Sequence, residues 1–481
     1  MIYLVTNQQS MFNSVGYSLA SIEESLEYLN TLDIIGFDTE TMGMDPYNCQ
    51  LLSMQLGDND KQYVIDCTTV DPSEYKEILE KKELIMHNAK FDLRFLYYQG
   101  IMPIKVYDSF LMERVLHTGI DTVRKSLDAV TYKYCKIELD KTVRGHIHRE
   151  GLSARVIKYA ADDVKYLHEI RRKQIVALEE KGLKRTASLD NEFVKVLAYV
   201  EYCGFYMNPL DWQKKCDEDL KDLAAVTRKL NLFILDNAET YQHFIDTQLD
   251  MFSEGVKCRI NWSSSQQVIP FMQSLGVDTK IKDKKSGIMK DSVDKKVLAG
   301  QKNKHPIIKT YIEYTEKQKV VSTYGENWFD YINPKTGRIH SNFTQIMNTG
   351  RLSSGQKAKK KMNIPQMPNM QNIPSDTRTR HCFQAEEGNM LIVSDYSGQE
   401  QIVLANRSKD ADLLEFYKKG LGDMHSFVAS KIFPELAELS LGDIKNDHKQ
   451  KRQIAKGAGF AINYGGTGIT ISQNLNISMS K

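Results

Sequence analysis

The fold of the first part of the chain is decided by one stretch, Ile34-Ile35-Gly36-Phe37-Asp38-Thr39-Glu40. Its apolar run predicts a buried strand, and alternate residues of a strand point to the same face. Asp38 and Glu40 would therefore project side by side, and two carboxylates held that close repel each other unless a cation lies between them. Two solvent-exposed acids at a strand end explain the motif equally well, so the later carboxylates decide between the two interpretations.

Strand patterns alternate with helical patterns over about the first 185 residues. Short apolar runs predict strands over Met1–Val5, Leu32–Phe37, Leu51–Leu56, Tyr63–Asp66 and Leu84–Met86. A helical pattern covers Ser73–Lys82, with Ser73 as its N-cap. This order predicts an α/β layer structure with a mixed sheet.

Two further acidic positions follow at helical sites. Asp92 ends the stretch His87–Asp92, which leads into a helical run, so Asp92 lies near a helix start. Tyr159 and Asp163 are four residues apart in a helix predicted over Ser153–Glu180, and they share one face. Each cluster alone is usually structural, since helix starts favour acids. Together with the first pair, four carboxylates can hold two divalent ions about 4 Å apart, and the tyrosine hydroxyl could orient an attacking water.

The order D-x-E, N-x-x-x-D and Y-x-x-x-D resembles the three motifs of the DnaQ-like 3′–5′ exonucleases, in their tyrosine-containing subclass. The resemblance covers about residues 1–185 and implies a ribonuclease H-like fold. It also implies catalytic roles for Tyr159 and for the four acids, and it makes these acids the ligands of two Mg²⁺ or Mn²⁺ ions: Asp38, Glu40, Asp92 and Asp163.

Composition limits the remaining possibilities. A chain of 481 residues predicts two or more domains, and a net charge of +2 means that any nucleic-acid surface must come from local clusters. The seven cysteines are scattered without a C-x-x-C pair, which argues against a zinc site or disulfide framework. No apolar run approaches the ~18–20 residues that span a bilayer. We therefore expect a cytoplasmic protein, in the host cytoplasm if it is phage-encoded.

The middle of the chain is mainly helical. Apolar periodicity predicts helices over Leu189–Cys203, ended by Gly204, and over Asp211–Ala238. The lysine-rich stretch Lys280–Lys304 is typical of a solvated surface, although its lysines together would suit contacts to phosphates. The region resembles the thumb helices of a DNA polymerase.

From Gly337 onward, polar and basic motifs follow one another closely. The runs 349–354 and 368–374 are rich in Arg, Asn, Gln and Ser, which suits contacts to phosphates and base edges. The basic run Lys357–Lys361 fits either a solvated surface or a DNA backbone contact. An apolar run starting at Met390 predicts a strand that ends in Asp395. As at Asp38, a carboxylate at the end of an apolar strand is placed to hold a metal ion. Two cations and two aromatic residues then recur at every fourth position, which places them on one helix face: Arg452, Lys456, Phe460 and Tyr464. The cations could bind a triphosphate, and the aromatic rings could stack on its base.

These motifs resemble family A DNA polymerases, the bacterial DNA polymerase I type that includes phage members. The resemblance implies that Asp395 is a catalytic palm aspartate that binds metal, and that Glu400 excludes ribonucleotides. It implies that the four residues on the helix face belong to the fingers helix. It further implies contacts to primer–template and nucleotide from Arg351, Gln371, Asn372 and His425, the last within Asp423-Met424-His425.

Two departures from the family pattern matter. The palm motif reads Asp-Tyr-Ser-Gly-Gln-Glu-Gln, where many relatives have Asp-Tyr-Ser-Gln-Ile-Glu-Leu-Arg, so Ile402 replaces an arginine. The His-Asp-Glu motif that supplies the second palm ligand does not occur in this sequence. We therefore expect an incomplete polymerase domain, for which a split gene, an interrupted gene and a fragment all remain open explanations.

The sequence thus predicts an α/β exonuclease domain at 1–185 and an incomplete polymerase domain at 186–481. The latter divides into a mainly helical thumb at about 186–336 and a partial α+β palm and fingers at about 337–481. We expect a phage-type DNA polymerase with proofreading activity in DNA replication, and its partners would be DNA primer–template, a single-stranded 3′ end and dNTPs. A second chain that supplies the rest of the palm is a further possible partner. Two alternatives remain: a standalone 3′–5′ exonuclease whose C-terminal region only binds nucleic acid, and a non-catalytic DNA-binding subunit of a split polymerase.

Overall fold

The structure, a computed structural model, describes residues 1–8, 15–140, 142–143, 150–246, 257–283, 286–358, 366–469 and 471. Two predicted basic stretches lie partly outside these ranges, at 284–285 and 359–361. The chain forms two compact units, one of residues 1–213 and 326–386 and the other of 214–325 and 387–481. The predicted domain division near residue 185 stays a prediction.

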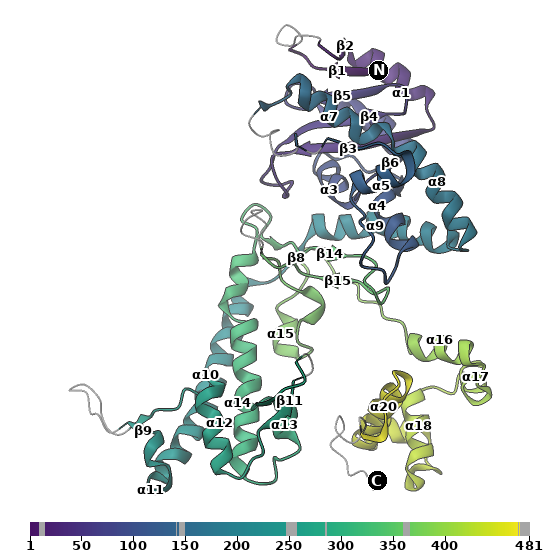
Figure 1. Ribbon diagram of the computed structural model, residues 1–481. Coiled ribbons are helices and arrows are strands. Elements are labelled where there is room, and N and C mark those ends of the chain that lie inside the picture. The colour runs from purple at the N-terminus through teal and green to yellow at the C-terminus, as the bar shows by residue number, and fades with distance from the viewer. Residues whose placement is uncertain are drawn as a thin grey trace. The chain divides into compact units, whose positions relative to one another are not determined.

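The first unit is built on a seven-stranded sheet with the order β2-β1-β5-β4-β3-β6-β7 (Figure 1). Its strands are β1 (Ile2–Val5), β2 (Ser18–Ala20), β3 (Ile34–Thr41), β4 (Leu51–Gly57), β5 (Gln62–Asp66), β6 (Glu83–Met86) and β7 (Lys105–Asp108). β3 runs antiparallel to β4 and parallel to β6, so the sheet is mixed. The predicted α/β class is confirmed.

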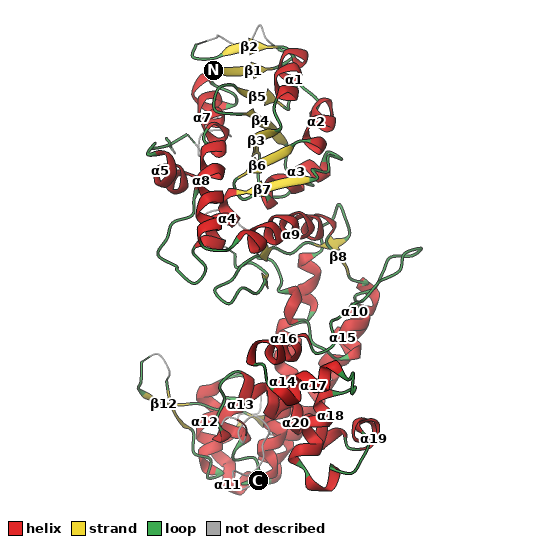
Figure 2. Ribbon diagram, turned by 90° about the vertical axis from the view of Figure 1, so that its right-hand side faces the viewer, coloured by secondary structure: helices red, strands yellow, loops and turns green. Residues whose placement is uncertain are grey.

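Helices cover both faces of this sheet. Figure 2 shows α1, α2 and α3 on one side and α7 and α8 on the other. The helices of this part are α1 (Ile22–Thr31), α2 (Lys76–Lys81), α3 (Lys90–Tyr98), α4 (Ser109–Leu116), α5 (Leu127–Cys135), α7 (Ala154–Lys165), α8 (Leu167–Glu180) and α9 (Lys184–Cys203). The sheet core contains Ile35, Phe37 and Met54, whose side chains are fully buried.

Two predicted helices are divided in the structure. The first is a 3₁₀ turn, Pro72–Tyr75, followed by α2, and its N-cap is Asp71 because the Ser73 N–H donates to Asp71 Oδ1 at 2.9 Å. The predicted N-cap at Ser73 is therefore wrong. The second divides at Tyr166 into α7 and α8, and Ser153, at which the helix was predicted to begin, is the N-cap of α7.

Residues 326–386 pack into the same unit as the sheet. β13 (Arg338–Ile339) pairs with β8 (Phe205–Tyr206), and β14 (Phe343–Thr344) pairs with β15 (Ser353–Ser354). A cluster of aromatic rings adds to the packing: Trp212 lies 5.1 Å from Trp328, and Trp328 lies 5.8 Å from Phe383, between ring centroids. Helix α15 (Thr377–His381) also belongs here.

The second unit is mainly helical. Its helices are the greater part of α10 (Pro209–Asp236), then α11 (Ala238–Tyr241), α12 (Ser265–Ser274), α13 (Lys295–Ala299), α14 (Pro306–Thr323), α16 (Gln399–Ser408), α17 (Ala411–Lys418), α18 (Met424–Ile432), α19 (Leu441–Asp447) and α20 (Lys449–Asn463). Two small antiparallel pairs complete it: β9 (Ile245–Asp246) with β10 (Lys257–Cys258), and β11 (Lys280–Lys282) with β12 (Met289–Asp291). None of the helices in the described ranges combines the length and apolarity needed to cross a membrane.

The strand predicted from Met390 is absent from the structure. Residues 390–396 form no strand, and the side chains of Met390 and Ile392 are 86% and 87% exposed. A strand requires a neighbour that pairs with its backbone N–H and C=O groups. No described residue pairs with this run, so its apolar pattern alone does not make it a strand.

Candidate active site

Strand β3 presents the first pair of carboxylates on one face. Every second side chain of β3 is buried, among them those of Ile35, Phe37 and Thr39. Asp38 and Glu40 are partly exposed. This alternation follows from the two-residue period of a strand. The sequence prediction that Asp38 and Glu40 lie side by side agrees with this geometry.

A glycine on β3 lets helix α7 approach that face. A Cβ added at Gly36 would lie 2.9 Å from the backbone oxygen of Val164 and 3.1 Å from that of Gly57. Any larger residue would therefore push α7 away from β3. Because Asp163 precedes Val164 on α7, this close contact brings a third carboxylate to Asp38 and Glu40.

Three carboxylates converge between β3 and α7. One oxygen from each of Asp38, Glu40 and Asp163 lies within 4.8 Å of the other two, and Asp163 is buried. Carboxylate oxygens are the ligands that Mg²⁺ and other hard cations prefer, so this donor set fits a divalent cation. Tyr159 lies one turn before Asp163 on α7 and is partly buried. The structure thus assembles three of the four predicted metal ligands.

Asp92 lies near this group but is not part of it. It occupies the first turn of α3, as predicted, and is 2% exposed. Its Oδ1 accepts a hydrogen bond of 2.6 Å from Thr39 Oγ1, the residue between the two β3 carboxylates. Burial raises the pKa of Asp92 to about 7, and the negative charges of Asp108 and Glu40 add to the effect. A cation bound nearby would favour the ionised form of Asp92.

Asp108 fixes the start of α3, and the sequence did not identify it as a site residue. Its carboxylate accepts four backbone hydrogen bonds, from the N–H groups of Asn88 (3.0 Å), Ala89 (2.9 Å), Phe110 (2.9 Å) and Leu111 (3.1 Å). It therefore caps α4 and holds the loop that enters α3, where Asp92 lies. An Asp between a strand pattern and a helix pattern is typical of an N-cap, which is the signal that could have revealed it.

Two segments that were predicted to contact DNA, 349–354 and 368–374, lie next to each other in the first unit. Ser354 Oγ donates to Asn369 Oδ1 at 2.8 Å and accepts from the Gln371 N–H at 3.1 Å. The runs 349–354 and 368–374 are therefore adjacent. Three predicted contact residues, Arg351, Gln371 and Asn372, are exposed on this part of the unit.

In the second unit, α18 and α20 bring together several predicted nucleotide-contact residues. The Arg452 guanidinium donates twice to Asp423, each time at 2.7 Å, and this contact holds the pKa of Asp423 well below its usual range. The rings of His425 and Phe460 are 5.8 Å apart. Of the other two predicted residues, Lys456 lies between Arg452 and Phe460 in α20, and Tyr464 directly follows the last residue of this helix.

The two predicted palm carboxylates are not part of this cluster. Glu400 lies exposed in the first turn of α16, and Asp395 lies exposed in the run without a strand. In the described residues, no group of three metal-ligating side chains includes either of them. Their predicted roles stay predictions.

A mixed sheet in which β3 and the covering helix α7 share three carboxylates agrees with the class that the sequence motifs resemble, the 3′–5′ exonucleases. Comparison with family models agrees with this class: the model described as 3′–5′ exonuclease matches residues 17–175. The model described as DNA polymerase family A matches residues 237–481. The chain belongs to DNA polymerase family A.

Two curated relatives and a solved structure are similar over most of the chain, and a third relative is similar over less than half of it. DNA polymerase I of Aquifex aeolicus is 27% identical over 92% of this chain and 70% of its own length. DNA polymerase I of Borreliella burgdorferi is 26% identical over 95% of this chain and 48% of its own length. The thermostable DNA polymerase I of Thermus aquaticus is 37% identical over 42% of this chain and 22% of its own length. The chain therefore spans about half or less of two of these three relatives.

The solved structure is the POL domain of Pol1 from M. smegmatis, described as a complex with DNA primer-template and dNTP. It is 20% identical, with a TM-score of 0.69, and the match covers 95% of this chain and 73% of that one. At this identity, the likeness concerns the fold.

Proposed function

We propose that this chain is a 3′–5′ exonuclease that removes nucleotides from the 3′ end of DNA, as the proofreading part of a replicative family A polymerase. The observation that carries the proposal is the convergence of Asp38, Glu40 and Asp163 within 4.8 Å. Such a concentration of negative charge is unfavourable without a cation. A module that only binds DNA has no need of it. We expect the enzyme to work in the cytoplasm, since its cysteines are scattered along the sequence without a C-x-x-C pair.

Two Mg²⁺ or Mn²⁺ ions at this cluster would supply an activated water and neutralise the charge of the phosphodiester. Asp38, Glu40 and Asp163 would hold the ions, and Asp92 would complete the set from α3. Asp92 is kept close by its hydrogen bond to Thr39. The hydroxyl of Tyr159, one turn from Asp163, would orient the attacking water, which is the positioning role of a general acid–base group.

The test is the release of nucleotides from a 5′-labelled single-stranded oligonucleotide in Mg²⁺. Asp38→Ala should lower the rate by about 10³-fold or more, since it removes one of the carboxylates that would hold the ions. Asp33→Ala is the matched control, because Asp33 lies exposed just before the same strand. Wild-type rates for Asp38→Ala would refute the metal assignment. Tight oligonucleotide binding without cleavage in any divalent metal would favour a non-catalytic subunit.

We further propose that template-directed synthesis by the second unit needs a strand that pairs with residues 390–396. Support comes from this run itself, since Leu391 and Val393 are 63% and 81% exposed although their pattern is that of a buried strand. The pairing strand would come from a polypeptide that carries the family's His-Asp-Glu motif. Fingers residues such as Arg452 and His425 would bind the incoming dNTP.

Primer extension distinguishes this proposal from a standalone exonuclease. The chain alone should not extend a primer, and adding a polypeptide that carries the missing motif should produce extension. Efficient extension by this chain alone would contradict the need for a further strand. No extension above either component would favour the standalone exonuclease.

A further inference from the structure

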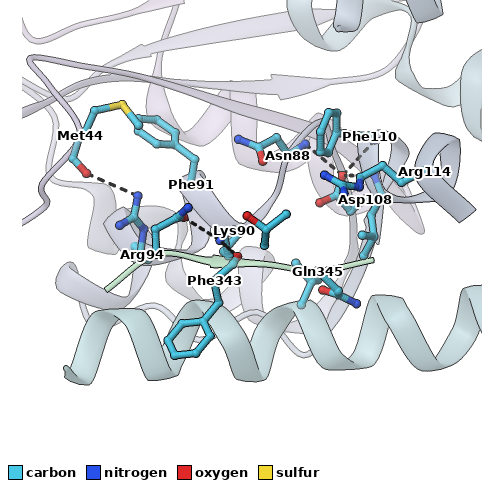
Figure 3. A pocket seen from close by; sticks show the side chains of 14 residues that line it. Met44, Asn88, Lys90, Phe91, Arg94, Asp108, Phe110, Arg114, Phe343 and Gln345 are labelled. Carbon is cyan, nitrogen blue, oxygen red and sulfur yellow. Dashed lines mark hydrogen bonds between the residues drawn. The ribbon is translucent and has the colours of Figure 1, made fainter. Parts of the chain in front are cut away.

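A pocket of about 240 Å³ lies within the first compact unit, and its lining includes Phe91, the residue directly before Asp92. It is bounded by the starts of α3 and α4 and by residues 342–345, which include β14 (Figure 3). Figure 3 shows Phe91 and Phe110 on its walls, Arg94 and Arg114 toward its two ends, and Gln345 on the opposite strand. The lining thus combines aromatic rings, cations and amides.

The cations of the pocket differ in their partners. Lys90 Nζ lies 2.6 Å from Glu201 Oε1, and Arg94 Nε lies 3.7 Å from Glu201 Oε2, so these two cations share one buried carboxylate. The carboxylate of Asp108 also lines the pocket, but it already accepts hydrogen bonds from four backbone N–H groups. Neither acid is available to a third cation.

Arg114 is this third cation. Its Nη2 donates to the backbone oxygen of Ile346 at 2.5 Å, and its guanidinium carbon lies 5.8 Å from the centroid of the Phe110 ring. Within the described ranges, no carboxylate forms an ion pair with it, and burial lowers the pKa of its guanidinium. A half-buried charge without a counter-charge is costly, and an anionic ligand would offset that cost.

The position of the pocket indicates which anion would bind. Phe91 lies directly before Asp92, and Met44 follows the strand that carries Asp38 and Glu40. A strand with its 3′ end at the carboxylates would thus have preceding nucleotides near these side chains. Cations beside aromatic rings are the chemistry by which proteins hold single-stranded nucleic acid without reading its sequence.

We propose that Arg114 binds a backbone phosphate of the single-stranded substrate on the 5′ side of the scissile bond, with a base against Phe91 or Phe110. Arg114 is then a positioning residue of the exonuclease, and this inference rests on the proposed function. One wall of the pocket comes from Thr344 and Gln345, in the polymerase-like part of the sequence. The substrate site of the exonuclease is therefore completed by a segment far along the chain.

Binding of a fluorescein-labelled dT6 oligonucleotide, followed by anisotropy between 50 and 200 mM salt without divalent ions, tests the proposal. Arg114→Gln should weaken binding about tenfold, the effect of losing one charge-assisted hydrogen bond. It should also reduce the slope of log K against log salt by about 0.7, the value for one phosphate contact on a single strand. Arg114→Lys, which keeps the charge, should retain the slope.

Arg124→Gln is the control, because the Arg124 side chain is 79% exposed and pairs only loosely with Asp128, at 3.7 Å. Wild-type affinity and slope in Arg114→Gln would overturn the proposal. Weaker binding with an unchanged salt slope would also overturn it, since that result reports a structural role for Arg114.

A kinetic comparison separates this proposal from the proposed function. The small substrate is the p-nitrophenyl ester of thymidine 5′-monophosphate, which reaches only the carboxylate site. Arg114→Gln should lower kcat/KM for dT6 about tenfold more than kcat/KM for the ester. Equal losses on both substrates would overturn the role of Arg114. If the wild-type protein cleaves neither substrate, the exonuclease function fails, and the binding measurement still decides the pocket proposal.

Discussion

Replacing Gly36 by alanine tests whether the close approach of α7 to β3 builds the candidate metal site. The new Cβ would lie 2.9 Å from the backbone oxygen of Val164, whereas an ordinary carbon–oxygen contact is about 3.4 Å. Helix α7 would therefore have to retreat by roughly 0.5 Å, the difference between these distances. Such overpacking costs about 1–3 kcal/mol of stability. Asp163 would move with Val164, away from Asp38 and Glu40.

The expected consequence is a weaker metal site. Ligand distances in metal sites tolerate only about 0.2 Å, so a shift of roughly 0.5 Å should raise the Mg²⁺ concentration needed for half-maximal rate. A 1 Å misplacement can cost about 100-fold in rate, so we expect a loss of about tenfold at saturating Mg²⁺. Nucleotide release is measured against Mg²⁺ concentration, together with thermal unfolding.

Gly300→Ala is the matched control for this experiment. Gly300 has φ of −72°, and an added Cβ there would meet no atom within 4 Å. It should leave both the rate and the melting temperature unchanged. Unchanged Mg²⁺ dependence in Gly36→Ala would refute the reasoning, even if the melting temperature falls, because the helix contact would then not set the ligand geometry.

Three further predictions concern polar contacts within one unit or the other. Asp108→Asn should lower the melting temperature, because the amide cannot accept all four N–H groups and each buried unpaired group costs about 1–3 kcal/mol; equal melting would contradict the role of the cap. Glu201→Gln should lower the free energy of unfolding by about 3–5 kcal/mol, because Lys90 loses its counter-charge. Adding Lys90→Met should restore part of this loss in the same unfolding assay. Wild-type stability of Glu201→Gln would contradict the role of the ion pair. Asp423→Asn should lower the melting temperature at pH 7, because the variant loses the ion pair with Arg452. The difference in melting temperature from wild type should shrink as the pH falls below about 4, because the depressed pKa of Asp423 stabilises the folded protein only where the unfolded carboxyl is ionised. A difference that does not change with pH would contradict the ion pair with Arg452.

The sequence was sufficient for the elements that periodicity and local motifs control. β3 and its two carboxylates follow from one apolar run with alternating faces, and Ser153 marks the start of α7 through ordinary capping. The four-residue spacing of Tyr159 and Asp163 places them on one helix face because the helix turns 3.6 residues at a time. These inferences need no knowledge of distant contacts.

The geometry of the site depends on contacts that no local pattern reveals. Spacing predicts that Asp92 begins a helix, but its burial and its bond to Thr39 arise only when α3 packs against β3. The role of Gly36 likewise appears only when α7 crosses the strand. The apolar run at 390–396 shows the converse, since a pattern typical of a buried strand gives no strand where the described residues offer no partner.

Lys90 joins segments of the first unit that lie far apart in the sequence. Its ammonium group contacts Glu201 at 2.6 Å and Asn342 Oδ1 at 2.9 Å, partners that lie 111 and 252 residues further along the chain. A lysine inside an exonuclease-like motif is expected to be solvated, and only the fold shows that it is buried. Because a buried ammonium group is costly without its carboxylate, α3, α9 and the segment at 342–345 depend on one another for stability. The exonuclease-like helix α3 and the polymerase-like segment at 342–345 therefore belong to one packed unit.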